Sequence, residues 1–197
     1  MDGVHIDESW PVWKQFYTAY YPLLRDMCAV FLVCLVLFGV VFNIHTVSGS
    51  SMEPTFDSGT IIIGNHIAPD LERGNIVVCK PSNYDKIIIK RIIGVPGDVI
   101  DIDYENGVVY RNGVALEEDY VKAPTRADLG LELPITVEDD CYFVMGDNRN
   151  GSRDSRSLSV GTIKEEYIVG RVLFRFFPFD RFGKVSDSGR LNIITAD

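Results

Sequence analysis

Residues 87–93 read IIIKRII, a lysine and an arginine within a run of five isoleucines. In an extended strand Ile88, Lys90 and Ile92 point to one face, and the residues between them point to the other. Isoleucine on both faces predicts a strand that is buried on both sides, or one that is buried on one side and presents an apolar working surface on the other. Because arginine keeps its charge in proteins, Arg91 needs a carboxylate partner or contact with solvent.

Further β-type runs after residue 45 predict a mostly β domain over residues 46–197. Asn106-Gly107 and Asn112-Gly113 are typical of tight hairpin turns. Within the domain, a short helical turn is expected only at Thr162–Tyr167. The runs are rich in Ile, Val, Phe and Tyr and are broken by Gly, Pro, Asp and Asn; they read TIIIGNHI, GNIVVCK, KIIIKRIIGV, VIDIDYENGVVYRNGVAL, DCYFVMGD and GRVLFRFF.

The composition excludes several classes of protein. Hydrophobic residues make up 46% of the chain and charged residues 24%, as in ordinary globular proteins. A net charge of −9 without a Lys/Arg stripe argues against a nucleic-acid partner. Cys79 and Cys141 have neither Cys-x-x-Cys spacing nor a nearby histidine, so we expect no metal and no cofactor. Whether these two cysteines form a disulfide stays open, since a sequence does not give their separation.

Residues 27–42, MCAVFLVCLVLFGVVF, contain no charged side chain and predict a membrane helix. Extension through residue 44 gives a helix of about 27 Å, close to the roughly 30 Å of a bilayer's hydrocarbon core. Lys14 and Arg25 precede the segment, and the next basic residue is Arg73. This bias favours a cytoplasmic N-terminal segment over residues 1–26, an anchor over 27–45 and an extracytoplasmic domain over 46–197.

A cleaved signal peptide is the alternative, with the small residues 47–49 at the cleavage site. The residues before the apolar segment are net acidic and contain aromatic residues and two prolines, which is unusual for a signal peptide. We therefore expect a retained single-pass anchor.

Two polar segments could supply chemistry to the β domain. SGSSMEPT, residues 48–55, is a small-residue loop that contains Ser51. Burial lowers the pKa of a lysine, so Lys90 between apolar walls could act as a neutral general base. The simpler alternatives are an ordinary serine loop and a lysine that extends along an edge strand into solvent.

VMGDNRNGSRDSR, residues 144–156, interleaves opposite charges among turn-forming residues. This pattern favours an ion-paired loop that braces neighbouring strands, and a solvated polar loop is the alternative. Ser152 could orient a buried amine by hydrogen bonding. The charged residues of interest are Asp147, Arg149, Asp154 and Arg156.

Taken together, Met-x-Pro-Thr after Ser51, then RGNIVV, KRIIGVPGD and MGDNRNGSRDSR, resemble the type I signal peptidase family, in the compact form of Gram-positive bacteria. The resemblance covers residues 27–183 and implies a fold of coiled antiparallel sheets. It implies that Ser51 is the nucleophile, Lys90 the general base and Ser152 the serine that hydrogen-bonds the lysine. It also implies that Asp147, Arg149, Asp154 and Arg156 order the active site, and that Arg73 and Gly74 form a structural turn, followed here by Asn75.

The chain departs from some family members at Gly49, where they have a serine that helps to hold the oxyanion. This leaves the Ser51 backbone N–H as the expected oxyanion donor, with Ser48 or Ser50 as a speculative second donor. A serine–histidine pair of Ser51 with His66 is a minor alternative.

The resemblance implies substrates that are exported preproteins with Ala-x-Ala-like cleavage sites. Val47 and Ile89 are expected to form walls of the substrate pockets, and the enzyme is expected to be monomeric and in contact with membrane lipid. FRFFPFDRF, residues 174–182, either seats the domain on the membrane or forms a core strand and turn.

Two other functions are compatible with parts of the sequence. A self-cleaving regulator of the same β family is disfavoured, because the chain has neither an Ala-Gly nor a Cys-Gly dipeptide. The other is a membrane-tethered β binding or assembly domain that keeps the scaffold without catalysis.

Overall fold

The computed structural model describes residues 10–65 and 71–185, and the chain divides into two compact units, Met1–Val41 and Phe42–Asp197. His66 lies outside the described residues, so its predicted pairing with Ser51 is not addressed.

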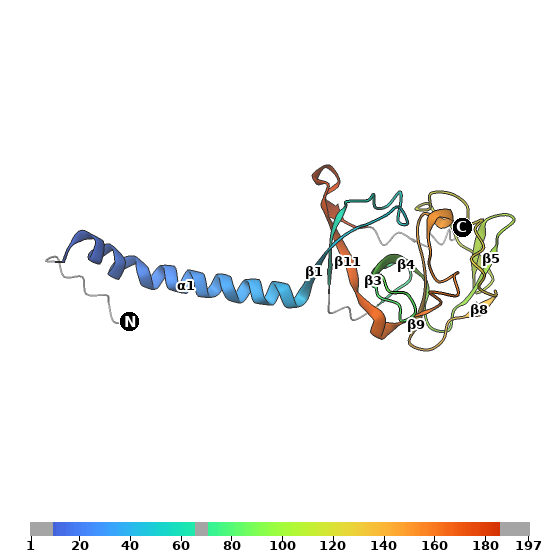
Figure 1. The fold of residues 1–197 in the computed structure, drawn as a ribbon, viewed down its shortest axis with the longest axis horizontal. Helices are drawn as coiled ribbons and strands as arrows, with labels where there is room; N and C mark the ends of the chain where they lie inside the picture. The colour runs from blue at the N-terminus through green and yellow to red at the C-terminus, as the bar shows by residue number, and fades with distance from the viewer. Residues whose placement is uncertain (1–9, 66–70, 186–197) are drawn as a thin grey trace, which may run out of the picture. The chain divides into compact units, whose positions relative to one another are not determined.

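The first unit contains one helix, α1, over Val12–Val41 (Figure 1). Its 30 residues give a length of about 45 Å. Stacked rings one helical turn apart, such as Tyr17 on Tyr21 at 4.7 Å between centroids, support its first half. The most apolar window of α1 has a mean hydropathy of 2.3. By length and composition, α1 is the one helix of the described residues that could cross a membrane, a test that a signal sequence also meets.

The helix boundaries differ from the predicted anchor over residues 27–45. Helix α1 begins before Lys14 and ends at Val41, and Phe42–Thr46 form strand β1. The change from helix to strand follows from pairing, because β1 lies antiparallel to β2 (Ile61–Asn65), with Phe42 opposite Asn65. A partner strand is a tertiary feature that local hydropathy does not reveal.

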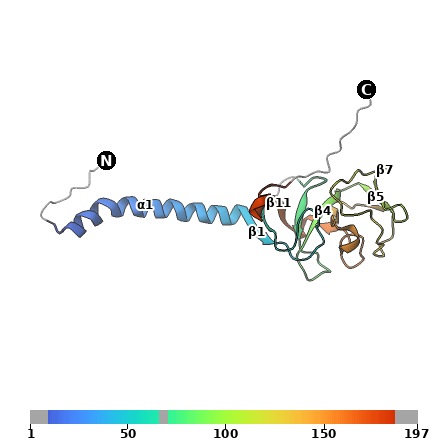
Figure 2. The same cartoon turned by 90° about the horizontal axis from the view of Figure 1, so that it is seen from above.

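The second unit is mostly β, and every strand pair among its described residues is antiparallel, which confirms the predicted fold class. The larger sheet has the order β1-β2-β11-β3-β4-β9-β10, with β12 paired to β11, and the smaller sheet has the order β7-β6-β5-β8. Within this unit β1 and β5 lie on opposite sides of β4 (Figure 1, Figure 2). The remaining strands are β3 (Ile76–Cys79), β4 (Ile88–Gly94), β5 (Val99–Asp103), β6 (Val108–Arg111), β7 (Val114–Ala115), β8 (Ile135–Thr136), β9 (Cys141–Met145), β10 (Ile163–Lys164), β11 (Ile168–Phe177) and β12 (Gly183–Lys184).

Turn chemistry explains the smaller sheet. The β6–β7 hairpin turns at Asn112 and Gly113, which both have positive φ, as a two-residue turn of this kind requires. The β5–β6 hairpin contains the predicted Asn106-Gly107 pair. Three short 3-10 helices are found in residues 71–185: Arg149–Gly151, Glu165–Tyr167 and Phe179–Arg181. The second of them lies within the helical turn predicted at Thr162–Tyr167.

The core surrounds β4, which pairs with β3 on one side and β9 on the other. Every residue of β3 and β9 is buried, and so are Ile92 and Ile93 on the two faces of β4. Of the two alternatives for this strand, burial on both sides is therefore correct for its second half. Cys79 and Cys141 are buried free thiols.

Candidate active site

Ser51 and Lys90, 39 positions apart in the chain, are in direct contact. Lys90 lies on central strand β4, and Ser51 lies in the turn between β1 and β2. The Lys90 Nζ donates to Ser51 Oγ at 2.7 Å and to the Ile89 carbonyl oxygen at 2.9 Å. Lys90 is 2% exposed, so the alternative of a lysine that extends into solvent is wrong.

The surroundings of Lys90 favour its neutral form. Burial lowers its pKa, because an ammonium loses hydration in an apolar setting. The carboxylates of Asp154 and Asp147 act in the opposite direction, and Arg156 adds to the lowering. The neighbouring Cys79 thiol offers little competing charge at neutral pH, since burial raises its pKa to about 12.

The turn that contains Ser51 is held by the residues that follow β9. The backbone N–H of Asn148 donates to Ser51 O at 3.0 Å, and Asn148 Nδ2 donates to Ser50 O at 3.1 Å. Gly146 passes so close that an added Cβ would lie 2.5 Å from Ser51 O. Met52 anchors the same turn in the core. The residues after β9 and the buried Met52 side chain therefore together fix the turn that carries the Ser51 hydroxyl.

Ser152 lies beside this contact but is not bonded to the lysine. It is 6% exposed, and within the described residues its Oγ has no hydrogen-bond partner. Its hydroxyl faces Gly146, where an added Cβ would lie 2.3 Å from Oγ. The hydrogen bond to Lys90 implied by the family resemblance is not formed, and Lys90 donates to Ile89 O instead.

Arg91 has its partner in Asp147. The Nε and Nη2 of Arg91 donate to the two carboxylate oxygens of Asp147 at 2.9 and 2.7 Å, and Nη1 donates to Gly74 O at 2.9 Å. Both side chains are almost completely buried. Thr55 donates to the same carboxylate, and the guanidinium lies 4.1 Å from the Tyr120 ring centroid. A buried bidentate pair of this kind fixes the orientation of both segments.

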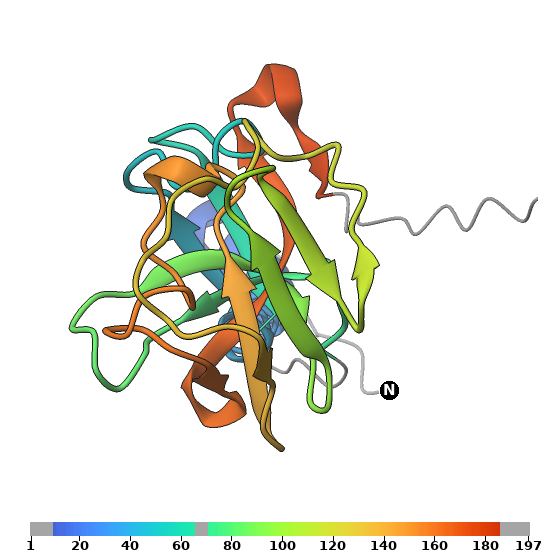
Figure 3. The same cartoon turned by 90° about the vertical axis from the view of Figure 1, so that its right-hand side faces the viewer.

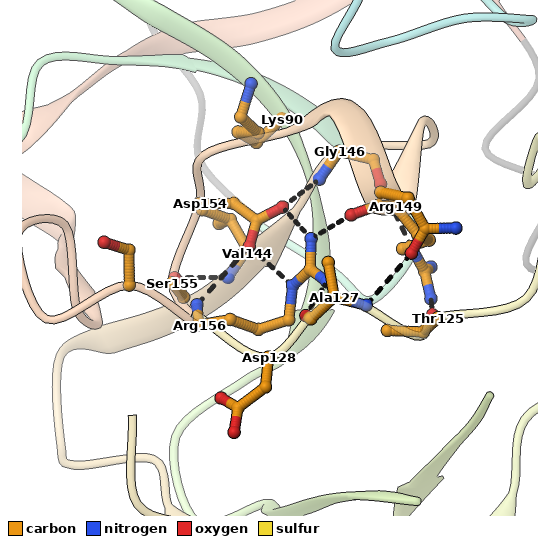
Figure 4. Close-up of polar contacts among 12 residues, drawn as sticks. Lys90, Thr125, Ala127, Asp128, Val144, Gly146, Arg149, Asp154, Ser155 and Arg156 are labelled. Atoms are coloured by element: carbon orange, nitrogen blue, oxygen red, sulfur yellow. Dashed lines mark hydrogen bonds and ion pairs between the residues drawn. The ribbon is translucent and has the colours of Figure 1, made fainter. Parts of the chain in front are cut away.

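Two further buried pairs brace the loop after β9. Arg156 donates to the Asp154 carboxylate, which also accepts the Gly146 N–H at 3.0 Å. Arg149 forms a bidentate pair with Glu118. Figure 4 shows the Arg156 side chain between Asp154 and Arg149, whose carbonyl oxygen it also binds. The predicted ion-paired loop is confirmed, and the alternative of a solvated loop is wrong.

A cleft of about 480 Å³ opens onto Ser51 and Lys90. Its apolar lining includes the predicted wall residues Val47 and Ile89, and Ser48 also faces it. The remaining lining residues are His45, Thr46, Met52, Tyr84, Lys86, Ile87, Ile88 and Arg153. In the described part of the chain, no group of three His, Cys, Asp or Glu residues could hold a metal ion.

Comparison with known proteins shows the family of the chain. The family model described as "Signal peptidase, peptidase S26" matches residues 22–177. The chain belongs to the signal peptidase family.

Curated members of the signal peptidase family support the assignment. The chain is 41% identical over 150 residues to "Probable signal peptidase I-2" of Synechocystis sp., covering 72% of this chain and 66% of that one. It is 33% identical over 175 residues to "Signal peptidase IB" of Staphylococcus aureus, covering 80% and 89%. A crystal structure of a signal peptidase I from Enterococcus faecalis matches with a TM-score of 0.41 and 25% identity, covering 53% of this chain and 97% of that one.

As a member of the signal peptidase family, the chain is a serine endopeptidase. Its predicted structural turn is also formed. Arg73 pairs with Asp98 at 2.7 Å, Gly74 supplies the carbonyl that binds Arg91, and the Asn75 side chain accepts the Glu72 N–H.

Several residues that build this signal peptidase site were not singled out by sequence reasoning. Asn148 lies inside the MGDNRNGSRDSR block, and Thr55 ends SGSSMEPT, so their motifs were recognised but their contacts were not. Glu118 and Tyr120 belong to no motif that we identified. Tyr120 donates to Glu118 at 2.7 Å and covers Arg91, which links the segment between β7 and β8 of the smaller sheet to the active site.

Proposed function

We propose that this enzyme removes signal peptides from exported preproteins, with Ser51 as nucleophile and Lys90 as general base. The observation that carries the proposal is the 2.7 Å contact between Lys90 Nζ and Ser51 Oγ in a buried setting that lowers the lysine pKa. A neutral amine keeps a lone pair, which can take the serine proton, and two N–H groups, one of which binds Ile89 O.

In the first half of the proposed reaction, the Ser51 hydroxyl proton passes to Lys90 Nζ while Oγ attacks the carbonyl carbon of the scissile peptide. The tetrahedral intermediate collapses as its C–N bond breaks. Lys90 gives its proton to the leaving amine, and the signal peptide stays on Ser51 as an ester. In the second half Lys90 accepts a proton from water, the resulting hydroxide attacks the ester, and Ser51 Oγ leaves and regains the proton.

The Ser51 backbone N–H is the proposed donor to the oxyanion. Among the described residues this N–H makes no hydrogen bond, so it is available to substrate. Ser48 faces the cleft, and Ser50 is not among the lining residues, which favours Ser48 as the second donor. Gly49, with φ of 91°, allows the chain to turn between them.

The membrane location is part of the same proposal. Helix α1 is long and apolar enough to serve as a single-pass anchor, and the basic residues before residue 27 favour a cytoplasmic N-terminus. The β unit would then face the exterior of the cell membrane, where the ends of signal peptides emerge. We propose that Asp147, Arg149, Asp154 and Arg156 keep the site ordered there, and that Ser152 adjusts Lys90 when substrate is bound.

We expect the full-length enzyme in detergent to cut a preprotein after an alanine at the last position of its signal peptide. Val47 and Ile89 narrow the cleft, so tyrosine at that position should reduce cleavage by about a hundredfold, because an overfilled apolar pocket cannot relax cheaply. N-terminal sequencing of the product measures the cut. Ser51→Ala is the control, and equal processing by the variant would overturn the proposal in favour of a binding domain without catalysis.

The rate should rise with pH in a manner set by Lys90. Only the neutral amine accepts a proton, so activity is lost as pH falls through the Lys90 pKa and is fully present above it. Because burial lowers that pKa from 10.5, kcat/KM should reach its plateau at a lower pH than a free amine would allow.

The pH profile is measured on a peptide without titratable side chains, with circular dichroism at each pH as the control for folding. The midpoint belongs to the coupled site rather than to one group. A rate that still rises tenfold per unit above pH 10.5 would contradict a buried lysine base.

A further inference from the structure

The hairpin formed by β11 and β12 carries an exposed aromatic cluster that the catalytic site does not use. We call it the phenylalanine tip; its members are 41–69% exposed and comprise Phe174, Phe176, Phe177, Phe179 and Phe182. Edge-to-face contacts join several of its rings, for example Phe177 and Phe179 at 5.4 Å. Figure 3 shows the tip of this hairpin, in red, projecting from the β unit. Residues 174–182 thus form a strand and turn as expected, but they do not lie in the core.

A basic pocket of about 300 Å³ lies beside the phenylalanine tip. Among the described residues no carboxylate lines it, and one of its cations, Arg91, is already neutralised by Asp147. Three further cations face the pocket: Arg175, Arg181 and Lys184. The other lining residues are Thr55, Tyr120, Gly183 and Val185.

These three cations are only partly neutralised by the described residues. Arg175 donates to the uncharged carbonyl of Thr55, and its pKa is lowered by burial and then by the nearby charge of Arg181, against which the carboxylates of Asp57 and Asp180 act. Arg181 pairs with Asp57 at 2.9 Å, and both side chains are more than half exposed, where an ion pair contributes little. Within the described residues Lys184 has no ion pair. The chain as a whole has a net charge of −9, yet positive charge is concentrated in this pocket. Such a concentration favours the binding of an anion from outside the protein.

We propose that this pocket binds the phosphodiester headgroup of an anionic lipid, while the phenylalanine tip enters the boundary between headgroups and acyl chains. Basic and aromatic side chains on one projecting surface fit a membrane interface, since the cations meet phosphate as the rings leave water. A soluble phosphate would use the pocket but leave the tip exposed. A second copy of this acidic chain would use the tip but not the positive charge.

The experiment uses the full-length enzyme in dodecyl maltoside, titrated with phosphatidylglycerol or phosphatidylcholine and read by native mass spectrometry. We expect the wild type to prefer phosphatidylglycerol, and Arg181→Gln/Lys184→Gln to reduce that preference by about 25-fold, since each basic residue near an anionic surface contributes about fivefold. Helix α1 is identical in all variants, so its own lipid contacts cancel. Ser51→Ala should bind like the wild type, which separates this site from catalysis.

Lys80→Gln/Lys164→Gln removes two exposed cations elsewhere on the β unit and should keep the preference. Phe179→Ser should weaken binding of both lipids while keeping the preference, and glycerol 3-phosphate should not displace the lipid. Three results would overturn the proposal: equal binding of both lipids by the wild type, an unchanged preference in Arg181→Gln/Lys184→Gln, or full displacement by glycerol 3-phosphate. A dimer that Phe179→Ser converts to monomers would assign the tip to a second copy instead.

Discussion

Ser51→Ala and Lys90→Met are each expected to lower kcat/KM for preprotein cleavage by about 10⁴-fold or more. Alanine removes the attacking oxygen, and methionine removes the lone pair that accepts its proton. Because the two side chains act as one unit, the double variant should be about as inactive as either single variant. The measurement is the cleavage rate of a preprotein by purified enzyme, calibrated against dilutions of the wild type.

Methionine is the informative replacement at position 90. The site is 2% exposed, so an arginine there would place a permanent charge among apolar side chains and disturb folding as well as catalysis. Methionine fills a similar volume without charge, and the fold should persist. Lys80→Met, at an exposed position outside the cleft, is the matched control and should cleave at the wild-type rate. A folded Lys90→Met enzyme that retained a tenth of the activity would remove Lys90 as the base.

Asp147→Asn is expected to lower the free energy of unfolding of the β unit by about 3–5 kcal/mol. The change leaves the Arg91 guanidinium buried without a countercharge, and the cost of an unpaired buried cation exceeds the worth of the lost hydrogen bonds. Activity should fall as well, because Asp147 lies between Gly146 and Asn148, which position Ser51. Denaturant unfolding of the full chain in detergent, followed by circular dichroism, measures the effect.

Removing both partners distinguishes the charge from the contacts. Arg91→Leu/Asp147→Leu takes away both charges, so it should recover most of the stability lost in Asp147→Asn. Lys122→Gln breaks the exposed pair with Glu53 and should cost less than about 1 kcal/mol. If Asp147→Asn lowered the free energy of unfolding as little as Lys122→Gln, the buried Arg91–Asp147 pair would not be what holds the loop after β9 against β4.

The local sequence pattern was sufficient to predict the conformation of segments in which residues adjacent in the chain determine it. Both Asn-Gly pairs lie in hairpin turns, and the residues with positive φ there, Gly107, Asn112 and Gly113, are of types that adopt this conformation readily. The isoleucine run produced a buried strand because alternation and branching favour a strand at any depth. Residues 42–45, which were expected to continue the anchor, form part of β1 because they pair with β2, about twenty positions further along the chain.

Contacts between residues that are far apart in the chain could not be predicted from local pattern. The position of Arg91 among isoleucines predicted that it needs a carboxylate partner, but the chain has 28 acidic residues. Asp147 is the partner because β4 pairs with β9, the strand that ends just before Asp147. Glu118 and Tyr120 lie between β7 and β8 of the other sheet, and they reach Arg149 and Arg91 although no motif marks them in the sequence. Ser152 is the opposite case: its position in the motif predicted a hydrogen bond to Lys90, and the structure does not contain that bond.

By itself the sequence determined the class of this protein: an apolar segment, a β domain, and four ordered motifs with a serine and a lysine among them. These are properties of composition and short-range order, which survive in any conformation. Only the tertiary structure decided that Lys90 is buried and touches Ser51, and that spare cations gather beside exposed phenylalanines. The reason is physical, because the charge state of an amine and the availability of a cation depend on what packs around them, and that packing exists only in the folded chain.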